Sequence, residues 1–237
     1  MTTADLPRRL TAEAVGTAML LSAVVGSGIM AERLSGGNDA IALLANTVAT
    51  AAALVALILT FGSISGAHFN PAVSVADASQ GGLRWQDVPA YATAQVVGAV
   101  GGVWMAHAMF GERLFMLSLH ARSGPSQMLS EFVATFGLLS VIWGCARRRP
   151  DAIPFAVAAY IASAYWFTAS TSFANPAVTL ARALTDTFAG VRPADVPGFI
   201  VAQLAGAAAA TLLFRWLVPA LPARADRVVM PRSGVPA

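Results

Sequence analysis

The sequence predicts an all-α membrane protein with six transmembrane helices, two re-entrant half-helices and an inverted three-helix repeat. Three observations predict this fold class. Hydrophobic residues make up 57% of the 237-residue chain and charged residues only 11%, whereas a soluble domain carries about 25% charged residues. The apolar residues are gathered into long runs. The tripeptide Asn-Pro-Ala occurs twice, starting at residues 70 and 175.

The apolar runs predict the six spanning helices. Each run is close to the roughly 20 residues that a helix needs to cross the bilayer core. Because lipid offers no hydrogen-bond partners to the backbone, such segments cross as helices that pair their own N–H and C=O groups. The runs cover residues 10–31, 40–61, 88–110, 128–146, 153–169 and 196–218.

The two halves of the chain repeat each other, over about residues 8–110 and 126–218. Glu13 and Thr17 correspond to Glu131 and Thr135, and each half then carries one Asn-Pro-Ala. Three spans per half is an odd number, so the second half enters the membrane from the opposite side and the repeat is inverted. We expect one channel domain over residues 1–218 and a flexible cytoplasmic tail over residues 219–237.

The repeated tripeptides predict two half-helices that start inside the membrane. Asparagine is a good N-cap, and proline suits the first helical position. Both helix N-termini would point at the membrane midplane with partial positive charge, which opposes cations. Two asparagine amides donating to one passing oxygen would break a chain of hydrogen-bonded waters, so neutral solutes would pass and protons would not. The motif residues are Asn70, Pro71, Ala72, Asn175, Pro176 and Ala177.

Glu13 and Glu131 are acidic residues deep in predicted spans. A charge there costs at least about 2.5 kcal/mol unless it is paired or faces water. As proton relays they would indicate a pump. As structural acceptors they would bind the exposed backbone N–H groups of the re-entrant segments, and their symmetric placement beside the half-helices favours this second interpretation.

The arginines indicate topology rather than nucleic-acid binding. The chain has no lysine, and ten of its fifteen arginines fall on one side of a six-span arrangement, which places both termini in the cytoplasm. We expect a multi-pass protein of the cell membrane with the lipid bilayer as its environment. The arginines assigned to the cytoplasmic side are Arg8, Arg9, Arg84, Arg147, Arg148, Arg149, Arg215, Arg224, Arg227 and Arg232.

These motifs resemble the aquaporin (major intrinsic protein) family over about residues 8–218. The resemblance rests on the paired Asn-Pro-Ala motifs, the Gly-x-His-x-Asn-Pro-Ala form at residues 66–72, the paired Glu-x-x-x-Thr segments and the inverted repeat. It implies a pore through each subunit of a homotetramer and passive flow of water or small neutral solutes. The sequence shows no metal-ligand cluster, nucleophile–base pair or phosphate-binding loop, so we expect no enzyme activity, cofactor or metal. His68 resembles the family's inner-pore histidine.

The chain departs from the family at the outer filter. The residue after the second Asn-Pro-Ala is usually arginine in the family, and here it is Val178. Counting along the family pattern without gaps places the other filter positions at Thr50, Ser163 and Ser172. These four residues are small and uncharged, so we expect a wide, hydroxyl-lined filter without the five donors of an arginine.

The expected function is a channel for water, glycerol, urea and neutral metalloid hydroxides such as arsenite. A strict water channel is one alternative. Arg182 lies four residues after Val178, on the same helical face, and either reaches back to restore the filter's charge or sits in the outer vestibule. A secondary transporter is the alternative of another class, since inverted repeats and broken helices occur there as well.

Overall fold

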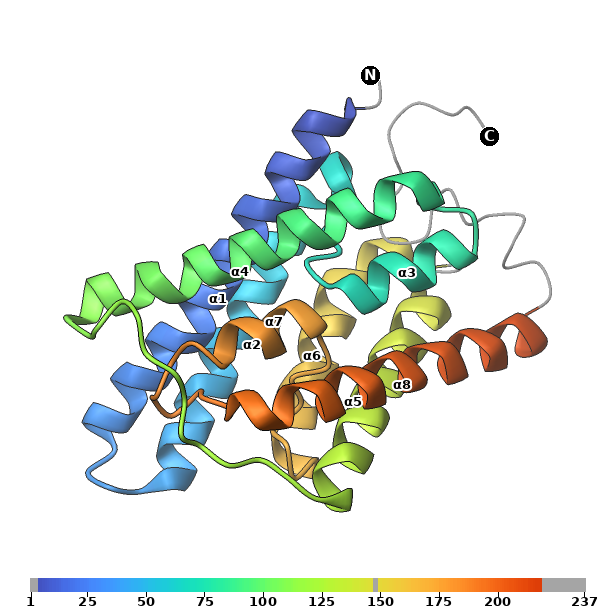
Figure 1. Cartoon of the computed structure of the whole chain (residues 1–237). Coiled ribbons are helices and arrows are strands. Elements are labelled where there is room, and N and C mark those ends of the chain that lie inside the picture. Colours follow the sequence, from blue (N-terminus) through green and yellow to red (C-terminus); the bar gives the residue numbers. More distant parts are fainter. Residues whose placement is uncertain (1–3, 147–148, 219–237) are drawn as a thin grey trace.

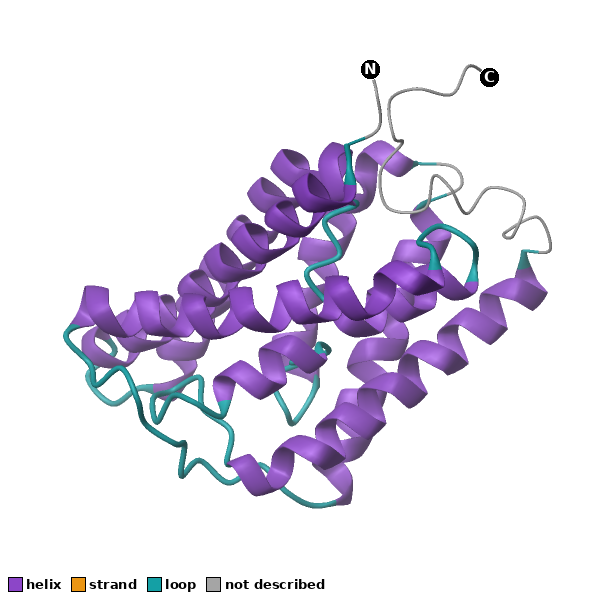
Figure 2. Cartoon of the chain, turned by 45° about the horizontal axis from the view of Figure 1, so that its top comes forward, coloured by secondary structure: helices purple, strands orange, loops and turns teal. Residues whose placement is uncertain are grey.

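The computed structural model describes residues 4–146 and 149–218, and this part of the chain consists of helices and loops without strands (Figures 1 and 2). The predicted tail at 219–237 lies outside the described residues. Each half contains three long helices and one short one. The α-helices are α1 (Leu6–Leu34), α2 (Asp39–Ser65), α3 (Pro71–Ser79), α4 (Val88–Phe110), α5 (Pro125–Cys145), α6 (Ile153–Phe167), α7 (Pro176–Arg182) and α8 (Val196–Leu217).

Local sequence signals set several helix ends. The side chain of Asn38 caps α2 by accepting hydrogen bonds from the backbone N–H groups of Ala40 and Ile41. The same helix ends at Gly66, which takes a left-handed conformation with φ of 94°. Gly111 ends α4 in the same way, with φ of 71°. Short 3-10 turns at Trp85–Asp87, Pro150–Ala152 and Pro193–Asp195 lead into α4, α6 and α8.

Four of the described helices are long and apolar enough to cross a membrane by length and composition alone: α1, α2, α5 and the segment Pro193–Leu217 that contains α8. Two of the six predicted spans, α4 and α6, are not among them. Helix α6 ends at Phe167 after 15 residues, two residues before the end of its apolar run. Helix α4 carries Gln95 and His107, both completely buried, so these two polar side chains are shielded within the bundle.

The helices of each half pack in the same way. Helix α1 lies against α2 and α4, and its counterpart α5 lies against α6 and α8. Close approach depends on glycine: a Cβ at Gly98 of α4 would lie 2.2 Å from the carbonyl oxygen of Ala14, and one at Gly206 of α8 would lie 2.4 Å from that of Phe132. Small residues of this kind let helix backbones touch in lipid. Helices α3 and α7 lie between α4 and α8 (Figure 1).

Candidate functional site: a pore between the two half-helices

The two short helices meet at their N-termini and are bonded to each other. The side chains of Asn70 and Asn175 cap α3 and α7 through their oxygens. One N–H of each amide crosses to the other half: Asn70 Nδ2 donates to the carbonyl of Ala174, and Asn175 Nδ2 donates to that of Phe69, both at 2.7 Å. An amide NH₂ has two donors, so each asparagine keeps a second N–H for a molecule in the pore.

The segments before the half-helices share an unusual backbone. Ala67 and Phe69 have φ of 49°, and Ser172 and Ala174 have φ of 52° and 49° at the corresponding places in the second half. Non-glycine residues in this left-handed region cost of order 1–3 kcal/mol each and persist only where the surroundings hold them. The same strained path in both halves therefore needs a strong anchor, and the buried glutamates lie beside it.

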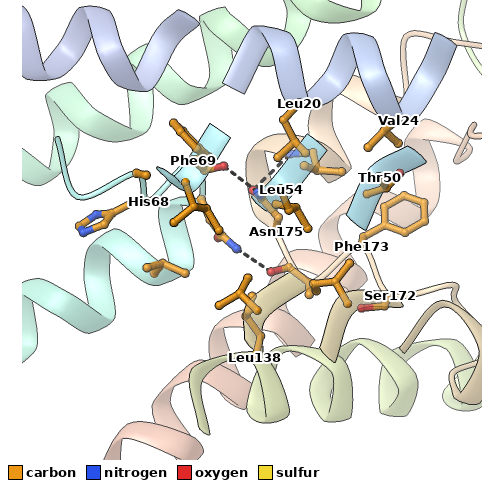
Figure 3. A pocket seen from close by; sticks show the side chains of 18 of the residues that line it. Leu20, Val24, Thr50, Leu54, His68, Phe69, Leu138, Ser172, Phe173 and Asn175 are labelled. Carbon is orange, nitrogen blue, oxygen red and sulfur yellow. Dashed lines mark hydrogen bonds between the residues drawn. The ribbon is translucent and has the colours of Figure 1, made fainter. Parts of the chain in front are cut away.

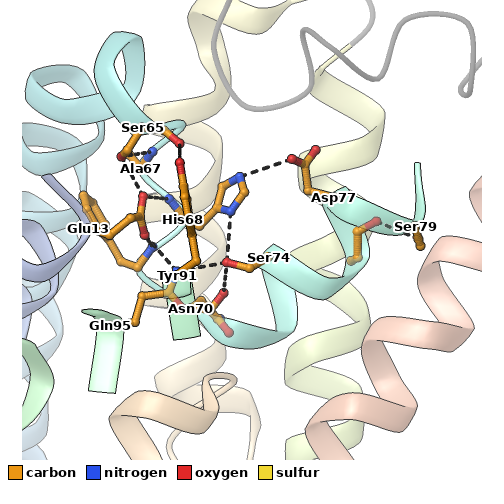
Figure 4. A network of polar contacts seen from close by, with 12 residues as sticks. Glu13, Ser65, Ala67, His68, Asn70, Ser74, Asp77, Ser79, Tyr91 and Gln95 are labelled. Atoms are coloured by element: carbon orange, nitrogen blue, oxygen red, sulfur yellow. Dashed lines mark hydrogen bonds and ion pairs between the residues drawn. The ribbon is translucent and has the colours of Figure 1, made fainter. Parts of the chain in front are cut away.

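Glu13 anchors the first re-entrant segment. Its carboxylate accepts hydrogen bonds from the backbone N–H groups of His68 (3.0 Å) and Phe69 (2.7 Å), from the hydroxyl of Ser65 (2.6 Å) and from Nε2 of Gln95 (2.8 Å) (Figure 4). The carboxylate is fully buried. Hydrogen bonds to a charged group contribute about 1.5–3 kcal/mol each, so this set offsets both the burial of the charge and the strained backbone.

Glu131 anchors the second segment in the same manner. Its carboxylate accepts from the backbone N–H groups of Phe173 and Ala174, both at 2.9 Å, and from Nε2 of Gln203 at 2.6 Å. This geometry fits the structural-acceptor interpretation, since the carboxylates face backbone donors. Sequence reasoning gave no role to Gln95 and Gln203, although an Ala-Gln pair recurs at corresponding positions of the two halves and could have indicated one.

A pocket follows the line between the half-helices and passes both asparagines (Figure 3). Most of its wall is apolar and comes from the long helices. The polar part of the lining lies along the re-entrant segments and near Thr50. The polar and ionisable lining residues are Thr50, His68, Asn70, Tyr165, Ser172, Asn175 and Arg182. A solute in this pocket would meet hydrocarbon on one side and hydrogen-bonding groups on the other.

Three of the four predicted filter residues line the pocket: Thr50, Ser172 and Val178. All three are buried, with 2%, 3% and 6% of their surface exposed. The hydroxyl of Ser172 is buried and has no hydrogen-bond partner among the described residues. The side chain of Val178 adds an apolar surface immediately after the second Asn-Pro-Ala.

The prediction for Ser163 is wrong. Ser163 is exposed on α6, its hydroxyl donates to the carbonyl of Tyr160, and it does not line the pocket. The pocket is lined instead by Tyr165, whose hydroxyl donates to that of Thr50 at 3.4 Å. Two residues along a helix turn the side chain by about 200°, so a small error in gap-free counting moves a residue from the pore to the outer surface.

Arg182 lies at the pocket and is held by its surroundings. It is 3% exposed, its Nε donates to the carbonyl of Ala189, and its guanidinium lies 3.4 Å from the ring centroid of Phe173. Arg122, from the loop between α4 and α5, approaches the same ring at 5.4 Å and donates to the carbonyl of Gly190 at 2.9 Å. Arg182 therefore has a feature of each interpretation. It binds a backbone carbonyl, as expected for a residue of the outer vestibule, and it also lines the pocket near the filter.

The comparison with protein families shows which family the chain belongs to. The model described as "Major intrinsic protein" matches residues 1–154 and 146–236, nearly the whole chain. The chain belongs to the major intrinsic protein family. This family member is 55% identical over 219 residues to "Aquaglyceroporin AqpS" of Rhizobium meliloti (strain 1021), covering 92% of the chain and 94% of that relative. It is also 36% identical over 129 residues to "Probable aquaporin NIP7-1" of Arabidopsis thaliana, covering 54% of the chain and 46% of that relative.

Among solved structures, this family member resembles the X-ray structure of the aquaglyceroporin from Plasmodium falciparum. The match has a TM-score of 0.72 and 19% sequence identity, and it covers 92% of the chain and 99% of that structure. It shows that the fold is the aquaporin fold, which confirms the predicted fold class. The protein is therefore a multi-pass membrane channel for water and small solutes, and it is not an enzyme. No group of three or more potential metal ligands occurs among the residues that the structure describes.

Proposed function

We propose that this channel passes water and small uncharged solutes, including glycerol, urea and neutral metalloid hydroxides such as arsenite, and that it excludes protons and ions. The observation that carries the proposal is Val178, which lines the pocket where the family usually has arginine. A valine there removes volume and five hydrogen-bond donors from the filter. Solutes larger than water gain room, and they meet a wall suited to molecules with both C–H and O–H groups.

The rest of the filter suits a polyol. Tyr165 offers an aromatic surface, while Thr50 and the unpartnered hydroxyl of Ser172 offer hydrogen-bonding groups. A molecule such as glycerol would place its carbon backbone on the apolar side and its hydroxyls toward the re-entrant segments. A relative of this chain that covers almost its whole length is named an aquaglyceroporin, which supports the same solute class.

Exclusion of ions rests on charge in the pore and on its apolar wall. The half-helices point their positive ends at Asn70 and Asn175, and Arg182 adds a full positive charge one helical turn from Val178. A cation would have to leave its water shell among these groups. Each asparagine keeps one N–H to donate. A passing water that accepts both of these N–H groups would point its own hydrogens away from the pore centre, which interrupts proton transfer.

We propose a cell-membrane location with both termini in the cytoplasm and assembly as a homotetramer of such pores. The arginine distribution supports the orientation. Large apolar side chains cover the outside of the bundle, and they would face lipid or neighbouring subunits; Leu44, Val97, Val201 and Leu212 are each more than half exposed.

Stopped-flow light scattering on proteoliposomes tests the proposal. The wild type and Val178→Arg are compared under water, glycerol and urea gradients, with arsenite uptake measured in parallel. We expect the wild type to pass the larger solutes and Val178→Arg to lose them while it retains water. A wild type that passes water alone would be a strict water channel, and our assignment of the filter would then be wrong. Saturable flux with strong temperature dependence would indicate a transporter instead.

A further inference from the structure

Arg122 lies outside the pocket but contacts residues of its outer wall. It belongs to the loop between α4 and α5, and its backbone N–H donates to Oδ2 of Asp195 at 2.8 Å. Its guanidinium lies 5.4 Å from the centroid of the Phe173 ring, which lines the pocket (Figure 3). The proposed passage of solutes has given this side chain no role so far.

Three consecutive backbone carbonyls after α7 are shared between two arginines. Nε of Arg122 donates to the carbonyl of Gly190 at 2.9 Å, and its Nη2 lies 3.5 Å from that of Phe188. The carbonyl between them, that of Ala189, accepts from Nε of Arg182. Ala189 and Gly190 are buried, and buried carbonyls need a hydrogen-bond partner. This short segment therefore joins the loop arginine to the arginine that lines the pocket.

The loop between α4 and α5 packs closely on the stretch that connects α7 to α8. A Cβ at Gly190 would lie 2.3 Å from Oγ of Ser118. The backbone N–H of Ser118 donates to the carbonyl of Ala183 at 3.0 Å, and that of Arg192 donates to the carbonyl of His120 at 2.7 Å. The loop is thus bonded near both ends of the stretch, and Arg122 is bonded within it.

The two guanidinium groups carry like charges and contact the same aromatic ring. That of Arg182 lies 3.4 Å from the centroid of Phe173, closer than that of Arg122. An aromatic face attracts a cation, but two cations near one ring also repel each other. Because each arginine is bonded to its own carbonyls on one buried segment, the backbone of residues 188–190 sets the spacing of the two charges.

We propose that Arg122 is a positioning residue of the outer filter. It fixes the carbonyls on either side of Ala189, and the carbonyl of Ala189 keeps Arg182 on the pocket wall against Phe173. The loop between α4 and α5 thus acts on solute selection without touching the solute. This inference rests on the proposed passage of glycerol, because it concerns the width of the same pocket.

Loss of Arg122 narrows the lumen in this arrangement. The carbonyls on either side of Ala189 lose their donor, so the segment shifts and Arg182 loses its fixed acceptor. A released guanidinium carries five donors, and passing water offers it acceptors. It then occupies space beside Val178, on the same face of α7, and this excludes glycerol before it excludes water.

The test is the ratio of glycerol to water permeability of the full-length protein in proteoliposomes, measured by stopped-flow light scattering. A ratio does not depend on how much protein has folded. We expect Arg122→Gln to lower it by a factor of about 2 or more, the lower end of the coupling between residues of one hydrogen-bond network. Arg113→Gln changes an exposed arginine of the same loop and should leave the ratio unchanged.

Two further variants separate positioning from folding and from charge. Arg182→Ala has no guanidinium to position, so adding Arg122→Gln to it should not change the ratio further. Arg122→Lys keeps the charge but lacks the planar fork that reaches two carbonyls. It should therefore lower the ratio as Arg122→Gln does, and it takes the place of that variant if Arg122→Gln does not fold.

An unchanged or raised ratio in either Arg122 variant would overturn the inference but not the channel. So would an equal fall when Arg122→Gln is added to Arg182→Ala, since Arg122 would then act on the pocket by another route. A wild type that passes no glycerol would instead refute the proposed function.

Discussion

Replacing Glu131 by glutamine removes the anchor of the second re-entrant segment without changing its size. The carboxylate accepts N–H groups from Phe173, Ala174 and Gln203 at 2.6–2.9 Å. A glutamine offers one oxygen and turns an NH₂ toward a donor. If the oxygen stays with Ala174 and Gln203, the buried N–H of Phe173 loses its acceptor. The lost charge-assisted bond and the unsatisfied donor together cost about 2–4 kcal/mol.

Thermal unfolding in detergent, followed by tryptophan fluorescence, measures this cost. We expect Glu131→Gln to lower Tm by about 4–16 °C, since 1 kcal/mol corresponds to roughly 2–4 °C for a chain of this size. Glu112→Gln is the matched control. Glu112 pairs with Arg33 at the surface, and such a pair contributes at most about 1 kcal/mol. Equal shifts for the two variants would refute the anchoring role of Glu131.

Two further perturbations test the packing and the charges outside the pore. Gly98→Ala should destabilise by about 1–3 kcal/mol because its Cβ would meet the Ala14 carbonyl oxygen. Gly101→Ala on the same helix, with open space around it, should be neutral or stabilising by up to about 1 kcal/mol; equal denaturation midpoints would contradict the close-approach argument. Burial opposes ionisation of Asp87, but hydrogen bonds from Arg84 and Arg9 outweigh it and hold its pKa below 3.8. The stabilisation that Asp87 contributes is the difference in unfolding free energy between the wild type and Asp87→Asn, and it should therefore be complete above about pH 5. It should fade as the pH falls below 3.8. An unfolding series from pH 3 to 7 in which this difference stayed constant would contradict the argument.

The fold and the centre of the pore are predictable from sequence because their signals are local. Proline and asparagine define a helix start by their own chemistry, so Asn70 and Asn175 could be placed at N-caps without tertiary information. The buried glutamates could be paired with the re-entrant segments because the inverted repeat shows both in the same relation. The fold class needed only these features and the apolar runs.

The outer filter was harder to predict than the centre of the pore. Which side chain of α6 reaches the filter depends on how that helix is rotated about its axis. Apolar and small residues surround Ser163 and Tyr165 on every side, so no amphipathic pattern shows which of them faces the pore. The place of Arg122 was also out of reach, since it comes from a loop and is fixed by backbone carbonyls such as that of Gly190. The contact of Asp77 with His68 could not be predicted, because it forms only when α3 is folded beside the re-entrant segment.

The crossed amides of Asn70 and Asn175 have a consequence for how the protein is made. Asn70 reaches the ribosome exit long before Ala174, whose carbonyl it must bind. Until the second half arrives, the first half-helix has its cap and its glutamate but no partner across the midplane. The first half therefore cannot complete its own fold during synthesis, and the pore takes its final form only when the second half inserts. Each repeat therefore depends on the other to complete the pore.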